Sequence, residues 1–429
     1  MEKMDLNEVV FADLHIHGPY SAGSSKKTKI EDILLTSNKI GLNVVGTGDI
    51  LQPNWFRYLQ DKLNRTKESS YQYNNEEKVH FLLSGEIEDA EGIHLLFLLP
   101  DFETASELRK KIMKKATNEK NLNAGRPIVK LQGYEIIELV HELNGLIGSA
   151  HSFTPFKSIF RENKYDNVTD FYKSSREKFD FIELGLSANS TLADKIRSLW
   201  DYPFLSNSDC HSPLPGKLGR EFNILKLDTI SFNNIRNALR KRKNNRIVGN
   251  VGLDPRLGKY YRSFCYKCRR RVYFGEKDIC NETTLTIKST NLIETLAKIK
   301  DKKIRCKCCR GLIKLGVLDR IKYIATTSER NLARPPYYNT VPLIEIIRII
   351  LNLKQQYTKK TINYYEELIK KLGTEIDILL MQDLSKIRAI NRTLAKVIEL
   401  LRKNKLPIVE GGGGHYGYLD AEKIKEEKL

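Results

Sequence analysis

Short apolar runs alternate with amphipathic stretches from residue 9 to about residue 240. The apolar runs have the length of strands and fall at 44–48, 81–87, 94–99, 146–150, 181–184 and 204–206. The stretches with helical periodicity fall at 29–39, 54–63, 103–115, 133–144, 191–200 and 233–241. This alternation predicts an α/β fold in which parallel strands form a barrel and helices surround it.

The rest of the chain has a different pattern, and we expect three units in all. The barrel is expected at 1–245, a linker with a basic, cysteine-containing ribbon at 246–330, and a helical unit at 331–429. The stretch 241–263 mixes charge with glycine and proline, which is typical of a linker. Helical periodicity returns at 341–356, 361–372, 375–380 and 387–402. The glycine run at 411–414 predicts either a close approach of the backbone to a phosphate or a flexible tail.

Histidines and carboxylates gather at the ends of the predicted strands. His15 and His17 close a further apolar run that begins at 9–11, and alternate side chains of a strand share one face. Asp209 and His211 form a second doublet after the last run. An isolated doublet is usually only a polar strand end, but four more segments each supply a metal-binding side chain: Asp49, Glu86, His94 and His151. Because the carboxyl ends of parallel strands meet at one edge, this recurrence predicts a cluster that binds divalent ions.

The mixture of imidazoles and carboxylates suits Zn²⁺, Mn²⁺, Mg²⁺ or Fe²⁺, and we expect two or three ions. Glu86 is the expected bridge between two of them, and Asp209, His211 and Glu86 are expected to act in catalysis as well as in binding. Such ions activate water for hydrolysis. Cys210 lies inside the second doublet, but we expect it to be a small packing residue because its neighbours point the other way.

Seven cysteines include two C-x-x-C pairs, formed by Cys265, Cys268, Cys306 and Cys309. That spacing lets two turns present four thiolates to one ion, so we predict one structural Zn²⁺ in the ribbon. Cys280 and Cys308 are spare thiols, and either could replace one of the four. The pattern favours a reducing compartment and a metal over a disulfide framework. The N-terminal residues lack the apolar stretch of a signal peptide, so we expect a cytoplasmic protein without membrane association.

The formal net charge of +19 is concentrated in one part of the chain. Residues 240–330 contain 25 Lys and Arg against 8 Asp and Glu, an excess of 17. A focused basic segment indicates a polyanionic partner, with nucleic acid as the first candidate and a solvated lysine-rich surface as the alternative. The side chains expected to contact DNA flank the C-x-x-C pairs: Arg269, Arg270, Arg271, Lys307 and Arg310.

Several motifs resemble those of a known family. DLHIH (13–17), GTGD (46–49), GEIE (85–88), SAHSFTPF (149–156) and SNSDCHS (206–212) are similar to motifs of the PHP metal-dependent phosphoesterases. The closer resemblance is to endonuclease Q, a DNA-repair nuclease family built on that domain. It is carried by ELGLSANS (183–190), GREFN (219–223), GLDPRLGKY (252–260), the cysteine pairs and RPPYYNTVPLIEII (334–347), in that order.

The resemblance implies a PHP-type distorted (β/α)7 barrel followed by a small zinc ribbon with four cysteine ligands and a C-terminal all-α domain. It also implies a metal-dependent endonuclease that cuts double-stranded DNA on the 5′ side of deaminated bases (hypoxanthine, uracil, xanthine) and of abasic sites. The target base is then expected to leave the stack. Arg220 of GREFN would either contact phosphate or form a structural salt bridge.

Two alternatives to this function remain open. One is a phosphomonoesterase of the histidinol-phosphatase type, which would leave the basic ribbon without a role. The other is a zinc protein that binds DNA without cutting it. We expect a monomer, and the sequence contains no convincing peptide for binding a sliding clamp.

Overall fold

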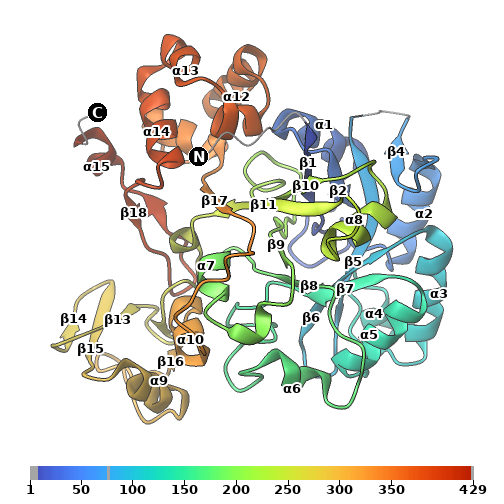
Figure 1. Cartoon of the computed structure of the whole chain (residues 1–429). Helices are drawn as coiled ribbons and strands as arrows, with labels where there is room; N and C mark the ends of the chain where they lie inside the picture. The colour runs from blue at the N-terminus through green and yellow to red at the C-terminus, as the bar shows by residue number, and fades with distance from the viewer. Residues whose placement is uncertain (1–7, 75–77, 427–429) are drawn as a thin grey trace.

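The computed structural model describes residues 8–74 and 78–426. Figure 1 shows the barrel at the right, the four-cysteine ribbon at the lower left and the C-terminal helices at the upper left, with β18 (Ile408–Val409) between the last two. The ribbon and the helical unit therefore lie along one flank of the barrel. Among the described residues, no helix is long and apolar enough to cross a membrane.

One mixed sheet forms the barrel and extends beyond it. Its strands follow the order β17-β11-β10-β1-β2-β5-β6-β7-β8-β9. They are β1 (Val10–Asp13), β2 (Val44–Gly46), β5 (His80–Glu88), β6 (His94–Leu99), β7 (Leu146–Ser149), β8 (Phe181–Glu183), β9 (Phe204–Leu205), β10 (Phe222–Lys226), β11 (Arg246–Leu253) and β17 (Tyr337–Thr340). The short strands β3 (Leu63–Arg65) and β4 (Tyr71–Tyr73) pair with each other, and β4 also pairs with β5.

The barrel is not all-parallel as the alternation predicted, because β6 runs antiparallel to both β5 and β7. Only residues 89–93 separate β5 from β6, which is too short for a helical crossover and permits only a hairpin. Asp89 builds that turn, since its Oδ1 accepts hydrogen bonds from the N–H groups of Glu91 and Ile93. His94 consequently begins its strand, and it lies at the same edge of the sheet as the residues that end the parallel strands.

Side chains close the barrel between β9 and β1. The two strands form no ladder, but Ile16 makes a parallel bridge with Cys210, and the His17 N–H donates to the Cys210 carbonyl at 2.8 Å. Asn207 Oδ1 accepts from the Leu14 N–H, and Asn223 Nδ2 donates to the carbonyl oxygens of Ala12 in β1 and of Ser206 directly after β9. Seven strands therefore surround the interior, which confirms the distorted barrel.

Amphipathic helices cover the outside, and five of the six predicted ones are present: α1 (Ile30–Ile40), α2 (Pro53–Lys62), α3 (Phe102–Met113), α5 (Gly133–Glu142) and α8 (Phe232–Leu239). The prediction at 191–200 is wrong, because only α7 (Ser190–Ala193) and a 3₁₀ turn form there. The segment after the ribbon interrupts the helix: Thr326 donates its N–H to the Lys195 carbonyl and accepts from the Arg197 N–H.

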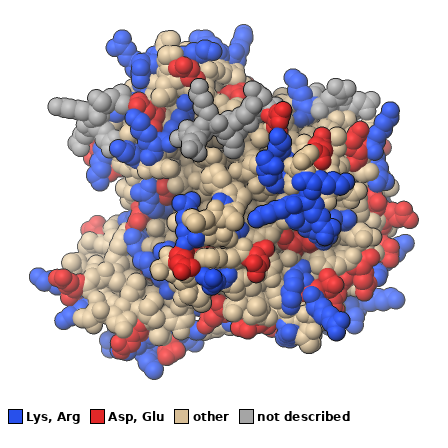
Figure 2. All heavy atoms as spheres, viewed as in Figure 1, with Lys and Arg blue, Asp and Glu red and all other residues tan. Residues whose placement is uncertain are grey.

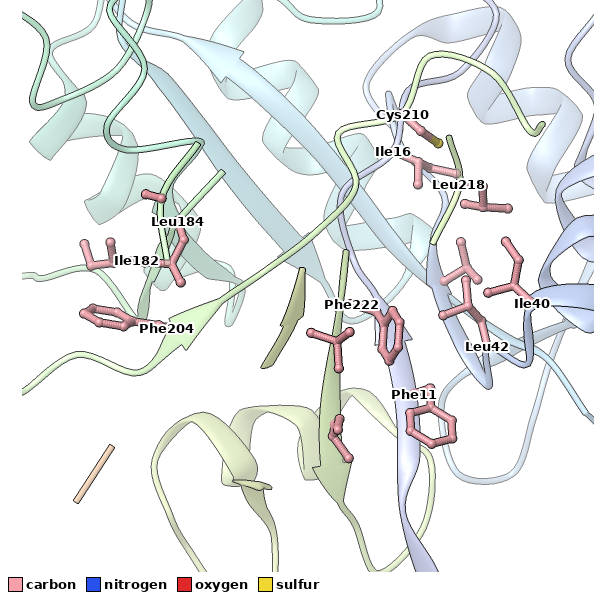
Figure 3. Close-up of a cluster of buried hydrophobic side chains, with 14 of the residues drawn as sticks. Phe11, Ile16, Ile40, Leu42, Ile182, Leu184, Phe204, Cys210, Leu218 and Phe222 are labelled. Atoms are coloured by element: carbon pink, nitrogen blue, oxygen red, sulfur yellow. The ribbon is translucent and has the colours of Figure 1, made fainter. Parts of the chain in front are cut away.

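The apolar interior between β1, α1 and β10 is shown in Figure 3, where the rings of Phe11 and Phe222 meet edge to face at 5.7 Å. Cys210 lies in this cluster with Ile16 and Leu218 and is 3% exposed. Burial raises the pKa of its thiol to about 12. The prediction that Cys210 is a packing residue is confirmed.

The predicted linker contains a strand of the barrel sheet. Residues 246–253 form β11, which pairs antiparallel with β10. The chain leaves the sheet for the ribbon and returns to it, because β17 then pairs parallel with β11. The ribbon is thus inserted between two neighbouring strands of the barrel sheet.

The ribbon has its own five-stranded sheet, in the order β14-β15-β13-β12-β16. Its elements are β12 (Phe264–Cys265), β13 (Arg271–Gly275), β14 (Ile279–Cys280), β15 (Thr284–Lys288), α9 (Leu292–Lys300) and β16 (Ile313–Lys314), followed by α10 (Val317–Ile324). A small separate core holds it together, with Val272, Leu285 and Leu296 fully buried. Cys280 and Cys308 form a disulfide, so neither is free to replace one of the four zinc ligands, and the ribbon combines a disulfide with the four-cysteine set where a metal in place of disulfides was expected.

The C-terminal unit is helical but more broken than predicted. Its helices are α11 (Leu343–Ile350), α12 (Lys359–Leu372), a π-helical turn (Asp377–Met381), α13 (Leu384–Ile390), α14 (Arg392–Arg402) and α15 (Ala421–Glu426). The stretch 387–402 is divided at Asn391, whose Oδ1 accepts the Leu394 N–H and so starts α14. The last residues, 421–429, have the charged composition of a solvated helix, and residues 427–429 lie outside the described part.

Candidate metal centre

The predicted ligands meet at one edge of the barrel. His15 and His17 follow β1, Asp49 follows β2, Glu86 lies near the end of β5, His94 begins β6, His151 follows β7, and Asp209 and His211 follow β9. All eight are buried or half-buried. The positions come from six segments, and the barrel brings every one of them to the same place.

Seven of the eight form three overlapping groups, in each of which the ligand atoms lie within 4.8 Å of one another. The groups are His15, His17 and Glu86; His17, Asp209 and His211; and Glu86, His94 and His151. Glu86 is at the centre: its Oε1 lies 3.1 Å from His94 Nδ1 and 3.2 Å from His151 Nε2. Its Oε2 lies 3.7 Å from His17 Nε2. A carboxylate shared between two groups is placed to bridge two ions.

Asp49 lies behind His17 and outside these groups, contrary to its predicted place among the ligands. Its Oδ1 is 3.0 Å from His17 Nδ1, and its Oδ2 accepts the Gly18 N–H at 2.8 Å. Glu183 does the same for the other imidazole of the doublet, with both carboxylate oxygens 3.0 Å from His15 Nδ1. Carboxylates on Nδ1 fix the rings so that both Nε2 atoms face the cluster, an arrangement common around metal-binding histidines.

The imidazoles and carboxylates of the cluster are suited to bind metal ions, and a buried nitrogen without a hydrogen-bond partner supports this. Nε2 of His15 is buried and has no hydrogen-bond partner within the described residues. It nevertheless faces Asp209 Oδ1 at 3.7 Å and Glu86 Oε1 at 3.9 Å. A buried polar nitrogen rarely stays unpaired, and a cation among these three atoms would satisfy it.

The cluster has a strongly negative field. Burial alone would lower the pKa of His15, but the charge of Glu183, with those of Asp209 and Glu86, raises it to about 9. The pKa of Glu86 lies well below its ordinary value, because His94, Arg126 and His151 outweigh the effect of its burial. Burial and the neighbouring charge of His17 lower the pKa of His211 to about 4. The carboxylates therefore stay ionised, and cations are favoured there.

Three of these residues have strained backbones. Asp49, His151 and Asp209 have φ values of 47°, 32° and 46°, which non-glycine residues rarely adopt. Each follows a strand, and the turn directs its side chain or backbone N–H into the cluster. Such strain persists only where the surrounding structure enforces it, and it concentrates at functional sites.

Sequence reasoning missed three residues of the site. Glu183 was noticed only within a family motif, although it is a carboxylate at a strand end like the predicted ligands. Arg126 donates from Nη1 to Glu86 Oε2 at 2.7 Å. Glu88 lies 3.1 Å from His94 Nε2 and also pairs with Lys157. The pattern of alternate strand positions could have indicated Glu88, but Arg126 lies in a loop without any periodic signal.

The four cysteines of the ribbon also converge. Cys265 Sγ lies 3.3 Å from Cys309 Sγ, and Cys268 Sγ lies 3.8 Å from Cys306 Sγ. Tetrahedral ligands on bonds of about 2.3 Å would be roughly 3.8 Å apart, so the set is close to that needed for Zn²⁺. The residue after each pair, Arg269 or Arg310, has a φ of 60° and donates its N–H to the carbonyl of the first cysteine.

Comparisons with known proteins cover nearly the whole chain. The MJ0043 C-terminal domain family matches residues 342–405. Uncharacterized protein MJ0043 of Methanocaldococcus jannaschii is 39% identical over 290 residues, which is 65% of this chain but only 33% of that protein. The crystal structure of the lesion-specific endonuclease PfuEndoQ from Pyrococcus furiosus has a TM-score of 0.85 and 37% identity, covering 98% of both chains. The structure of Endonuclease Q in complex with a 27-mer duplex substrate with an abasic lesion has a TM-score of 0.86 and 37% identity, covering 98% of this chain and 99% of that chain.

The distorted barrel, its imidazole–carboxylate cluster and the separate four-cysteine ribbon define the class as a PHP barrel carrying a ribbon and a helical domain. A relative with 37% identity over 98% of both chains shows the particular family. The chain belongs to the endonuclease Q family and is a metal-dependent endonuclease.

Proposed function

We propose that this protein incises double-stranded DNA on the 5′ side of deaminated bases and abasic sites. The observation that carries the proposal is a cavity of about 300 Å³ that is lined by His94, His151, Asp209 and His211 and opens to the surface. A relative with the same fold over its whole length has been solved with a duplex that has an abasic lesion at its active site. A lesion-bearing strand is accordingly the substrate that we expect at this cavity.

The seven clustered side chains would hold two or three divalent ions, with Glu86 shared between sites. When bound, such ions lower the pKa of water and neutralise charge on phosphate oxygens. The chain itself supplies orientation: Asp49 and Glu183 fix His17 and His15, and Glu88 fixes His94. Arg126, beside Glu86, adds a positive charge near the place where negative charge develops.

Lesion choice is expected to follow the ease with which a base leaves the stack. A deaminated base is not distinguishable while it is paired, so it must be extruded before the site can recognise it. An abasic position has no base to unpair. Extrusion costs least at mismatched or damaged positions, which is one source of selectivity.

The experiment that tests the proposal uses duplex oligonucleotides with one hypoxanthine, uracil or abasic site and matched undamaged DNA, with Mn²⁺ or Mg²⁺ present. We expect strand cleavage only in the lesion duplexes, mapped to the phosphodiester 5′ of the lesion. Histidinol phosphate serves as the comparison substrate. Cleavage of histidinol phosphate without incision of any duplex would instead support the phosphomonoesterase alternative.

The ribbon is proposed to bind the DNA backbone. Figure 2 shows Lys and Arg side chains scattered among Asp and Glu on this face, with some of them at the edges of the ribbon. Of the five side chains predicted to contact DNA, Arg269, Lys307 and Arg310 are exposed, and Lys307 pairs with Asp278. Arg271 has a structural contact, since its Nη1 donates to the Glu410 carbonyl. Arg269 and Arg310 are therefore the best residues with which to test the role of the ribbon.

Replacing Arg269 and Arg310 by alanine should weaken the binding of lesion DNA and of undamaged DNA by similar factors, because phosphate contacts carry no base information. Removing one such arginine from a phosphate should reduce the slope of log affinity against log salt by about 0.9. The measurement is DNA affinity between about 50 and 200 mM salt in the presence of a chelator. Arg57 in α2 and Arg65 in β3 are exposed arginines of the barrel and are the matched control pair. A double variant without lesion preference but with unchanged affinity for undamaged DNA would contradict this role.

A further inference from the structure

Three cations gather beside the metal-binding cavity without acidic partners. We call Lys217, Arg220 and Lys259 the cation cluster. Arg220 and Lys259 line the cavity together with Asp209 and His211. Lys217 precedes Arg220 by three residues in the same loop, and burial together with the neighbouring charges of Arg220 and Lys259 lowers its pKa. Within the described residues, none of them forms an ion pair with a carboxylate. Mutual repulsion makes such a group unfavourable unless it binds an anion.

Arg220 is held against the loop that carries Asp209. Its Nε and Nη2 both donate to the Ser208 carbonyl, at 2.9 and 2.8 Å. Ser208 directly precedes Asp209, so the guanidinium is held next to a metal ligand. The structural salt bridge that the sequence left open for Arg220 is not among its contacts.

The glycine-rich segment holds an aromatic side chain against this cluster. Gly414 donates its N–H to the Lys259 carbonyl at 3.1 Å, and Gly417 donates to the Leu257 carbonyl at 2.9 Å. A Cβ on Gly417 would lie 2.4 Å from the Arg256 carbonyl oxygen, so this approach requires glycine. The segment is therefore packed against the barrel, which disagrees with the flexible tail that the sequence left open as one of two alternatives. Its effect is to place Tyr416 at the cavity.

The Tyr416 hydroxyl lies in the field of the cation cluster. Burial would raise its pKa, but the charges of Arg220, Lys259 and Lys217 lower it below the ordinary value. Lys259 Nζ lies 5.8 Å from the centre of the Tyr416 ring and 5.1 Å from that of Tyr260. The hydroxyl thus adds a neutral hydrogen-bond donor to a group of cations.

We propose that the cation cluster and the Tyr416 hydroxyl bind a phosphodiester of the DNA backbone next to the scissile one. The inference rests on the proposed function, and it assigns a positioning role to these groups. Holding a neighbouring phosphate fixes the strand, so that the target phosphate reaches the metal ligands in a reactive geometry. Cations without acidic partners, a hydrogen-bond donor and a shared cavity are what such an anion requires.

The test combines Lys259→Gln with substrates in which one phosphate at a time is replaced by a neutral methylphosphonate. On ordinary lesion DNA, Lys259→Gln should lower kcat/KM about tenfold to a hundredfold. Neutralising the bound phosphate should cost the unaltered protein a similar factor. The kcat/KM of Lys259→Gln on the methylphosphonate substrate should then fall no further than with either change alone, because both changes remove the same contact. Tyr416→Phe should lower kcat/KM by a smaller factor. Its loss should likewise not add to that of the methylphosphonate at the bound phosphate.

Lys243→Gln is the matched control, since Lys243 is an exposed lysine of the barrel, and Tyr418→Phe controls for Tyr416. Both controls should incise like the unaltered protein. If the losses from Lys259→Gln and from methylphosphonate multiply at every position near the lesion, the inference is wrong and the proposed function stands. If the unaltered protein incises no lesion duplex, the proposed function fails, and the inference fails with it.

Discussion

Replacing Asp209 by asparagine is expected to reduce incision by on the order of a thousandfold or more. Asp209 Oδ1 lies 3.1 Å from His17 Nε2 and 3.7 Å from His15 Nε2, at the junction between two ligand groups. The nearby imidazoles outweigh burial and hold its pKa far below the usual range, so it is an ionised ligand. Asparagine keeps the shape but removes the charge that a divalent ion needs.

The measurement is incision rate together with melting temperature and DNA affinity. The Asp209 side chain is 29% exposed, so the variant should remain folded and bind lesion DNA about as well as the unaltered protein. Asp61→Asn is the control, because Asp61 is 74% exposed and, among the residues that the structure describes, its ion pair is with the neighbouring Lys62. Near-normal incision by the Asp209 variant would show that the cluster is not the catalytic centre.

Replacing Cys306 by serine is expected to remove the zinc that we assign to the ribbon and to unfold the ribbon locally. Cys306 and Cys265 are fully buried members of the ribbon core, which is small and separate from the core of the barrel. Metal binding in so small a unit supplies much of its folding free energy. DNA affinity should then fall about tenfold or more, because the ribbon side chains that bind phosphate no longer have fixed positions.

Zinc content and DNA affinity are the measurements for this variant, and Cys280→Ser is the control. Cys280 lies in the same ribbon, but it is paired with Cys308 and is not one of the four converging thiols. That control should retain its zinc. Unchanged zinc content and unchanged DNA affinity in the Cys306 variant would contradict the assignment of the ribbon site.

Short-range patterns predicted most of the barrel and its ligands. His15 and His17 were recognisable because strand side chains alternate, and the cysteine pairs because their spacing defines a knuckle. Sequence alone could not distinguish Asp49 from a ligand. A carboxylate that touches the metal and one that supports an imidazole both lie at strand ends, and only the backbone turn decides which way the side chain points.

Contacts between distant segments account for the rest. The helix predicted at 191–200 does not form, because Thr326, far along the chain, hydrogen-bonds to the Lys195 carbonyl and the Arg197 N–H. The place of Tyr416 depends on hydrogen bonds between the glycine run and residues 256–259, which no local pattern reveals. The antiparallel direction of β6 does not depend on distant contacts. The short connection at 89–93 is evident in the sequence and indicates a hairpin.

The most direct test of the central claim is incision and metal content measured on one sample before and after mild chelation. Incision of a lesion duplex should stop while about one zinc per chain remains in the closed four-cysteine site, and added Mn²⁺ should restore it. Open barrel sites exchange ions before a closed thiolate site does. Incision that continued after the barrel ions had been removed, or that stopped only when the ribbon zinc was removed, would contradict a catalytic metal centre in the barrel.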